Sequence, residues 1–171
     1  MVLGKDIMNG STYRLMEDFY RKYIRRRKGL SVCDVGSYDV NGTFKPIFNK
    51  HKYIGVDIIK GPNVDIVVDE YAYPFEDKTF NIVISGATIE HVKDIFKWIV
   101  ELKRITMKNG TLCIIGPSRF QQHRHPVDCW RILPDGMKFL LGEIAGLNVL
   151  EIKEDASNRR QVMCMGVARR I

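Results

Sequence analysis

Two acidic residues, each at the end of a short apolar run, are the residues best placed to do chemistry in this chain of 171 residues. Asp34 ends the first run and is followed by Gly36 and Gly42, and Asp57 ends a second run that starts at Tyr53. In nucleoside-binding α/β sheets, a glycine-bearing turn follows the first strand and an acid after the second strand accepts hydrogen bonds from the ribose hydroxyls. The spacing therefore predicts a nucleoside site where two buried strands end.

The glycine turn does not fit a dinucleotide. A dinucleotide site requires G-x-G-x-x-G, whereas residues 36–42 read GSYDVNG and lack the middle and last glycines of that pattern. Carboxylates at Asp34 and Asp39 would repel a pyrophosphate and suit a ligand with a cationic, amino-bearing end. S-adenosyl-L-methionine has a sulfonium, an ammonium group and no phosphate, so the turn favours it over a nicotinamide cofactor.

An ordered series of motifs over residues 30–153 resembles the class I S-adenosylmethionine-dependent methyltransferases of the methyltransferase type 11 kind. The series comprises the glycine turn, KYIGVDII, the PF and F before the fourth strand, EHV at residues 90–92 and the turn KNG at residues 108–110. The segment HPVDCWRILPDGMKFLL looks like one found in a methyltransferase subgroup often associated with glycan synthesis.

The resemblance implies a Rossmann-like α/β methyltransferase fold, a mostly parallel seven-stranded sheet in the order 3-2-1-4-5-7-6 with helices on both faces. It also implies S-adenosyl-L-methionine as cofactor and S-adenosyl-L-homocysteine as product. Asp57 matches the ribose-binding acid and Asp69 the acid that meets the adenine amine, although the adjacent Glu70 could serve instead. The expected cofactor-binding residues are Asp34, Gly36, Ser37, Tyr38, Gly42, Asp57, Ile58, Asp69, Glu70 and Ser85.

His91 is the candidate catalytic residue, because it lies at the mouth of the expected pocket after the fourth strand. An alcohol is a poor nucleophile unless its proton is accepted during transfer, and a neutral imidazole can accept it. The alternative is that His91 only orders its own loop.

Residues 121–131 are expected to bind the methyl acceptor, since loops on this rim carry specificity. The candidates are His123, His125, Asp128, Trp130 and Arg131. In the alternative reading, Asp128 pairs with Arg131 to fix the loop and Trp130 caps the core. We expect no metal site from His123, His125 and Asp128, because the H-x-H spacing is common by chance.

Length and composition predict one domain over residues 1–171, since 45% of the residues are hydrophobic. The resemblance implies that it is a single S-adenosylmethionine-dependent methyltransferase domain, with residues 1–29 forming an N-terminal helical cap. Cys33 and Cys113 fall in predicted buried strands, so reduced thiols are expected instead of zinc ligands. Since no signal peptide or membrane-spanning run is evident, we expect a cytoplasmic protein.

The net charge of +7 is partly concentrated in residues 21–28, RKYIRRRK. Such a run can hold nucleic acid, but a solvated helix end is favoured, since cations at a helix C-terminus complement the macrodipole. We therefore expect O-methylation of a hydroxyl on a sugar, a glycan or another small polar acceptor. The alternatives are an RNA or protein methyltransferase that uses the basic run, and a non-catalytic cofactor-binding partner subunit.

Hydrophobic periodicity predicts the secondary structure. The expected strands span residues 30–35, 52–57, 64–68, 80–85, 111–116, 147–153 and 160–169. The expected helices span residues 10–27, 42–49, 92–106 and 134–145. The last two strands are expected to form an antiparallel hairpin.

Overall fold

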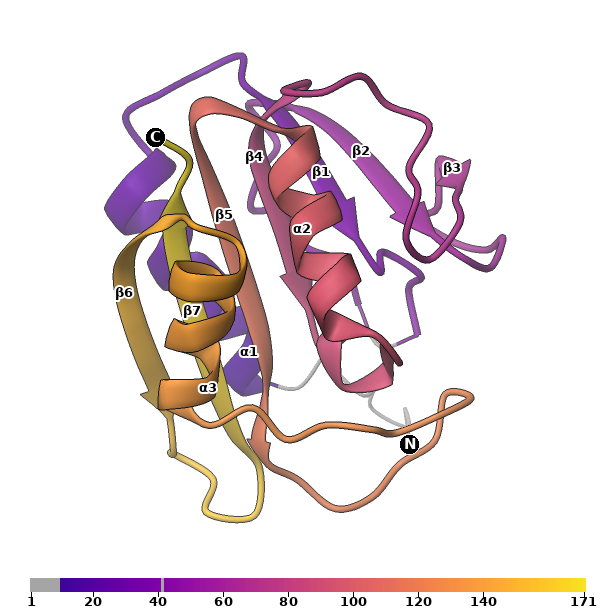
Figure 1. Cartoon of the computed structure of the whole chain (residues 1–171), viewed down its shortest axis with the longest axis vertical. Helices are drawn as coiled ribbons and strands as arrows, with labels where there is room; N and C mark the ends of the chain where they lie inside the picture. Colours follow the sequence, from indigo (N-terminus) through magenta and orange to yellow (C-terminus); the bar gives the residue numbers. More distant parts are fainter. Residues whose placement is uncertain (1–9, 41) are drawn as a thin grey trace, which may run out of the picture.

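A seven-stranded sheet runs through the middle of the structure, a computed structural model that describes residues 10–40 and 42–171 (Figure 1). Its strands are β1 (Ser31–Val35), β2 (Lys52–Asp57), β3 (Ile66–Val67), β4 (Phe80–Gly86), β5 (Thr106–Arg119), β6 (Asn148–Asp155) and β7 (Val162–Arg169). The order β3-β2-β1-β4-β5-β7-β6 confirms the predicted topology. β1 to β5 pair in parallel, whereas β7 is antiparallel to both β5 and β6.

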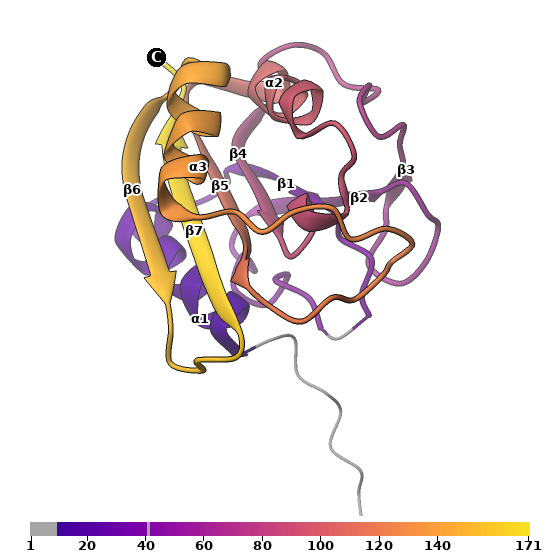
Figure 2. The same ribbon diagram turned by 60° about the horizontal axis from the view of Figure 1, so that its bottom comes forward.

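Helices cover both faces of the sheet (Figures 1 and 2). On one face lie α2 (Ile95–Ile105) and α3 (Pro134–Phe139), the latter continued by the π-helical turn η3 (Leu140–Ile144). On the other lies α1 (Gly10–Phe19), continued by the π-helical turn η1 (Tyr20–Ile24). Two hydrophobic clusters, one on each side of the sheet, form the core. Most residues of β1, β4 and β7 and of the middle of β5 are buried between them, which explains the continuous apolar runs of these strands.

Local sequence explains where α2 begins and which face it buries. The Asp94 carboxylate accepts a hydrogen bond from Lys97 N at 3.1 Å and caps the first turn. The buried side chains recur at helical spacing: Ile95, Trp98, Ile99, Leu102 and Ile105. The predicted helix at residues 92–106 is confirmed, but it starts at residue 95 because a single 3-10 turn, η2 (Ile89–His91), and a short loop come first.

The predicted helix at residues 42–49 is wrong. The segment forms successive tight turns, with Ile47 N donating to Phe44 O at 2.9 Å and Phe48 N to Lys45 O at 3.2 Å. Pro46 has no backbone N–H and disfavours helix at the residue before it, so a regular helix does not form. Phe44 and Phe48 are nevertheless buried against the sheet, and these two rings provide the cover that a helix would give.

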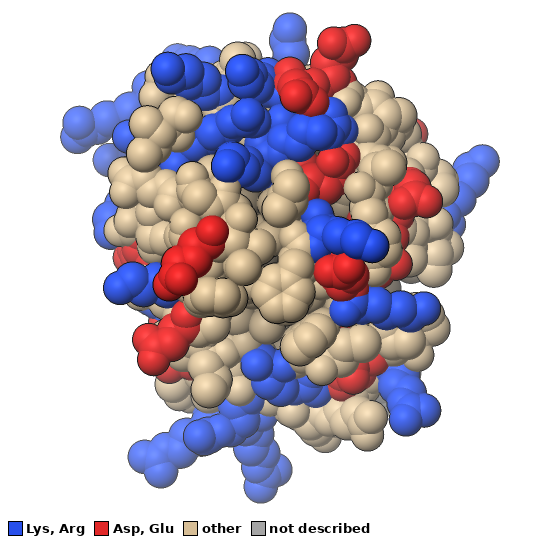
Figure 3. All heavy atoms as spheres, in the orientation of Figure 1, with Lys and Arg blue, Asp and Glu red and all other residues tan. Residues whose placement is uncertain are grey.

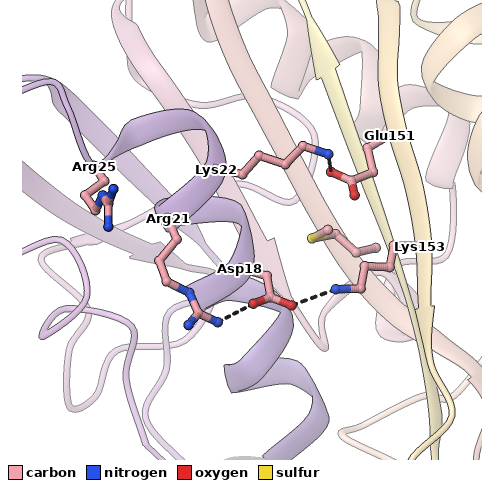
Figure 4. Close-up of a pocket in the computed structure, with 7 residues that line it drawn as sticks. Asp18, Arg21, Lys22, Arg25, Glu151 and Lys153 are labelled. Atoms are coloured by element: carbon pink, nitrogen blue, oxygen red, sulfur yellow. Dashed lines mark hydrogen bonds and ion pairs between the residues drawn. The ribbon is translucent and has the colours of Figure 1, made fainter.

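The basic run at residues 21–28 begins within η1 and continues beyond it, at the amino ends of the parallel strands. Ion pairs hold its first residues across a groove to β6: Lys22 Nζ donates to Glu151 at 2.9 Å, and Asp18, which pairs with Arg21, accepts from Lys153 at 2.6 Å (Figure 4). Arg25, Arg26, Arg27 and Lys28 are exposed. These contacts fit the predicted solvated helix end.

Lys and Arg side chains gather most densely at the end of the molecule where α2 ends and β5 begins (Figure 3). The basic run precedes β1 at this same end, because the parallel strands start there. The carboxyl ends of the strands lie at the opposite end of the sheet.

The cysteines form no disulfide, and Cys33, Cys113 and Cys164 are buried. Cys33 lies in β1 and Cys113 in β5, so their predicted placement in buried strands is confirmed. Among the described residues, no helix has both the length and the apolar character needed to cross a membrane.

Candidate cofactor and acceptor site

A cleft of about 700 Å³ opens at the carboxyl ends of β1, β2 and β4. Its volume is in the range of small-molecule sites. The cleft lining includes most of the predicted site residues: Asp34, Gly36, Ser37, Tyr38, Gly42, Asp57, Ile58, Glu70, His91, His123 and His125. The remaining predicted residues do not line it: Asp69, Ser85, Asp128, Trp130 and Arg131. Their cofactor or acceptor contacts stay predictions.

The turn after β1 requires glycine at position 36. Gly36 has a φ of +78°, and a Cβ built there would lie 2.0 Å from Thr88 Oγ1. Gly36 N and Ser37 N both donate to Val56 O, at 2.9 and 3.0 Å, which fixes the turn over the end of β2. A bare backbone therefore faces the cleft and lets a ligand approach closely.

Gly36→Ala should destabilise the protein more than Gly29→Ala does. Gly29 also has a positive φ, +67°, but a Cβ there meets nothing within 4 Å, so its substitution costs only the left-handed strain of about 1–2 kcal/mol. The clash with Thr88 should add about 1–3 kcal/mol. Equal losses of unfolding free energy in urea titrations would show that Thr88 does not constrain the turn.

Asp57 holds the rim of the cleft with both carboxylate oxygens. Oδ2 accepts from Tyr38 N and Oδ1 accepts from Ile59 N, each at 3.1 Å. A carboxylate has about four acceptor positions, so each oxygen keeps a lone pair for a ribose hydroxyl. Asp57 therefore shapes the loop on either side of it and can still bind the ligand.

The Asp34 carboxylate lies beneath this rim and is 3% exposed. Tyr53 donates its hydroxyl to Asp34 Oδ2. Burial raises the pKa of Asp34 from 3.8 to about 7, although the Tyr53 hydrogen bond opposes this shift. Asp34 thus lines the cleft as a buried carboxyl group held by Tyr53.

Asp34→Asn should reduce the pH dependence of stability. Between about pH 4 and pH 7 the folded protein keeps a proton on Asp34 that the unfolded chain has released, so the free energy of unfolding falls as pH rises through this window. The variant lacks this contribution, which should amount to roughly 2–4 kcal/mol. Denaturant titrations at pH 4.5 and pH 7.5 measure it, and an unchanged slope with pH would exclude Asp34 as its source.

Exposed apolar side chains surround the mouth of the cleft. Tyr38 is 40% exposed, Val40 62%, Ile58 49% and Ile59 56%. An aromatic base seated in the cleft would cover such a patch, since exposed apolar clusters of this kind mark binding sites. This rim, the open approach at Gly36 and the free lone pairs of Asp57 together fit an adenosyl ligand without phosphate.

His91 faces the acceptor side of the cleft and is half-buried. Its Nδ1 lies 2.6 Å from Val127 O, a contact that needs a proton on Nδ1 and leaves the Nε2 lone pair free. Burial lowers the pKa of His91 below its ordinary 6.5. The ring is therefore neutral at pH 7 and able to accept a proton.

Hydrogen bonds of Arg131 and Trp130 hold the loop at residues 121–131 in place. Arg131 donates to both oxygens of Asp128, at 2.6 and 2.8 Å, and to the carbonyls of Phe120 and Gln121. Trp130 Nε1 donates to Val92 O at 2.7 Å. These contacts brace the loop, in line with the alternative reading of Asp128, Trp130 and Arg131, and they hold His123 and His125 at the cleft.

The sequence did not single out Glu90, Tyr73, Trp98 or Thr12 as lining residues, yet all contribute to the cleft. Glu90 is 1% exposed, an uncommon position for a glutamate. Its place within the EHV motif was the available signal. Thr12 comes from α1, so this helix contributes to the wall of the cleft.

Comparisons with known proteins find methyltransferases. Residues 32–114 match a family model described as a methyltransferase domain. Together with the fold, this match indicates S-adenosyl-L-methionine as the cofactor. The match and the fold together make the chain similar to S-adenosylmethionine-dependent methyltransferases. A comparison with curated protein sequences gives no match.

Solved methyltransferase structures share the fold at low identity. An S-adenosylmethionine-dependent methyltransferase from Aquifex aeolicus has a TM-score of 0.65 and 18% identity over 96% of this chain and 100% of that one. One from Archaeoglobus fulgidus has a TM-score of 0.66 and 18% identity over 92% of this chain and 94% of that one. A putative methyltransferase solved in complex with the Haloferax volcanii Trm112 methyltransferase activator has a TM-score of 0.67 and 16% identity over 95% of this chain and 90% of that one. At these identities the likeness shows the Rossmann-like methyltransferase fold and leaves the acceptor open.

Proposed function

We propose that this protein transfers a methyl group from S-adenosyl-L-methionine to a hydroxyl of a sugar or a similar small polar acceptor. The observation that carries the proposal is the free Nε2 of His91 at the cleft, held in place by the Nδ1 contact with Val127 O. A neutral base at this position is what a hydroxyl acceptor requires.

The proposed roles of the residues follow from their contacts. The bound cofactor supplies an electrophilic methyl group on a sulfonium. Asp57 and the Gly36 turn orient the adenosyl part, and His91 Nε2 takes the hydroxyl proton as the acceptor oxygen attacks the methyl carbon. The sulfur keeps the electron pair of the broken bond, so S-adenosyl-L-homocysteine leaves uncharged at sulfur. The protein contributes alignment and a site with little water.

The polar side chains around His91 support a small hydroxylated acceptor. His123, Arg124 and His125 line the same part of the cleft and offer hydrogen-bond donors and acceptors to several hydroxyls at once. The glycan-associated look of the segment at residues 125–141 points the same way, by analogy.

The basic run gives little support to an RNA acceptor, because it lies at the amino ends of the strands, whereas the cleft is at their carboxyl ends. The remaining alternative is a partner subunit that binds the cofactor without transferring its methyl group. The Haloferax neighbour in complex with an activator makes partner dependence a question for the same assay.

Transfer of a radioactive methyl group to panels of sugars, nucleotide sugars, RNA and peptides tests the proposal. We expect incorporation into the sugar panel only, as a base-stable ether. Incorporation into RNA or peptide alone would overturn the acceptor class, and cofactor binding without any transfer would favour the partner-subunit alternative.

A further inference from the structure

Three side chains with metal-ligating atoms converge beside the acceptor end of the cleft. Glu90 and His91 come from η2, and His123 comes from the loop after β5. One ligand atom from each lies within 4.8 Å of the other two. Glu90 Oε1 is 3.9 Å from His91 Nε2 and 3.9 Å from His123 Nε2, so both imidazoles face one carboxylate.

The Glu90 carboxylate lacks the partners that a buried acid normally has. Glu90 is 1% exposed, and among the described residues its Oε2 has no hydrogen-bond partner. A buried polar atom without a partner costs about 1–3 kcal/mol, so its retention calls for an explanation.

The surrounding contacts turn both imidazoles toward Glu90. Val127 O holds the proton of His91 on Nδ1, which leaves Nε2 as the ligand atom. His123 Nδ1 lies 3.3 Å from Gln121 O and 3.6 Å from Asp128 Oδ2, so its Nε2 likewise faces inward. Ligating histidines usually donate their other N–H to a carbonyl or a carboxylate in this way.

We infer that Glu90, His91 and His123 form a site for a divalent ion of the zinc type. Two imidazole nitrogens and one carboxylate oxygen are the ligand set of many catalytic zinc sites, which leave a position open. Ligand atoms around tetrahedral zinc lie about 3.3 Å apart, so the observed separations close through small side-chain rotations.

This set differs from the combination of His123, His125 and Asp128, from which the sequence analysis expected no metal site. Both Asp128 oxygens accept from Arg131, at 2.6 and 2.8 Å, and Asp128 Oδ2 also accepts from His123 N at 2.7 Å. Asp128 therefore acts as a loop brace beside the site, and Glu90 takes the place of the carboxylate ligand.

The role of the ion, unlike its binding, rests on the proposed function. An acceptor hydroxyl at the open position would have its pKa lowered by the ion, so its proton leaves to water before the oxygen attacks the methyl carbon. His91 Nε2 is then a ligand, and it acts as the base only when no ion is bound. Chelation should therefore slow turnover without affecting cofactor binding.

Metal titration of the full chain, after treatment with a chelator, tests the site. We expect Co²⁺ to bind the wild-type protein in a 1:1 ratio with the visible absorption of tetrahedral cobalt, and Zn²⁺ to displace it. Glu90→Gln, His91→Ala and His123→Ala should each weaken Co²⁺ binding by at least about 10-fold. His125→Ala is the matched control, because His125 is not one of the three side chains whose ligand atoms converge. Its ring centroid lies 5.9 Å from that of His91 and 6.0 Å from that of His123, and Co²⁺ affinity should not change in this variant.

Two outcomes would overturn the site: a wild-type protein that binds neither Co²⁺ nor Zn²⁺, or ligand variants that bind Co²⁺ as tightly as His125→Ala does. Calorimetry with S-adenosyl-L-methionine on the same samples shows whether each variant is folded. It also separates the two proposals, because metal binding without cofactor binding would contradict the proposed function and leave the metal site standing.

Discussion

His91→Ala is expected to lower kcat by about 10²–10⁴-fold while leaving the affinity for S-adenosyl-L-methionine within a factor of two or so. The His91 ring is held by Val127 O, whereas Asp57 and the Gly36 turn, which are expected to hold the cofactor, are held by hydrogen bonds with other residues. Initial rates at saturating cofactor, together with calorimetry, measure the two effects separately.

The pH profile distinguishes a chemical role of His91 from a structural one. Since burial lowers the pKa of His91, the rate of the metal-free wild-type protein should fall only below pH 6.5, the ordinary pKa of histidine, and this acidic limb should vanish in metal-free His91→Ala. His51→Ala is the control, because His51 lies just before β2 at the far end of the sheet. A fully active His91→Ala protein would return His91 to ordering its loop.

Asp57→Ala is expected to weaken S-adenosyl-L-methionine binding by about 1–3 kcal/mol, or roughly 5–150-fold. The variant loses the acceptors for the ribose hydroxyls and also releases Tyr38 N and Ile59 N, which Asp57 holds at the rim. Calorimetric titration with the cofactor and with S-adenosyl-L-homocysteine measures the loss, which should be similar for both because they share the ribose.

Glu76→Ala is the matched control for Asp57→Ala. It removes one negative charge from an exposed position outside the cleft, so it should leave cofactor affinity unchanged. An Asp57→Ala protein that binds as tightly as the control would remove Asp57 from the ribose site. Equal weakening in both variants would mean that overall charge governs the affinity.

Much of the fold could be predicted because its signals are local. A sheet covered on both faces needs continuous apolar strands, so β1, β2 and β4 stand out in the sequence, and Asp34 and Asp57 mark where strands end. The prediction of a helix at residues 42–49 failed because Phe44 and Phe48 are spaced as in a helix, while Pro46 removes a backbone N–H donor from the middle of the segment. Burial of the two rings does not require the helix.

The candidate site was predicted less completely, because it depends on contacts between distant segments. The burial of Glu90 follows from its packing beneath residues 121–131, where Cys129 N donates to Glu90 O at 2.7 Å. No spacing in the sequence indicates this contact. Similarly, Asp128 pairs with Arg131 and therefore holds the loop, and this pairing depends on the three-dimensional path of the chain.

The central claim is that the ends of β1 and β2 hold the adenosyl group of S-adenosyl-L-methionine. A crystal structure of the protein with S-adenosyl-L-homocysteine tests it most directly. We expect the ribose on Asp57, the adenine against Ile58 and Tyr38, and the amino acid end over the Gly36 turn. A ligand bound elsewhere, or an empty cleft at ligand concentrations that saturate related enzymes, would contradict it.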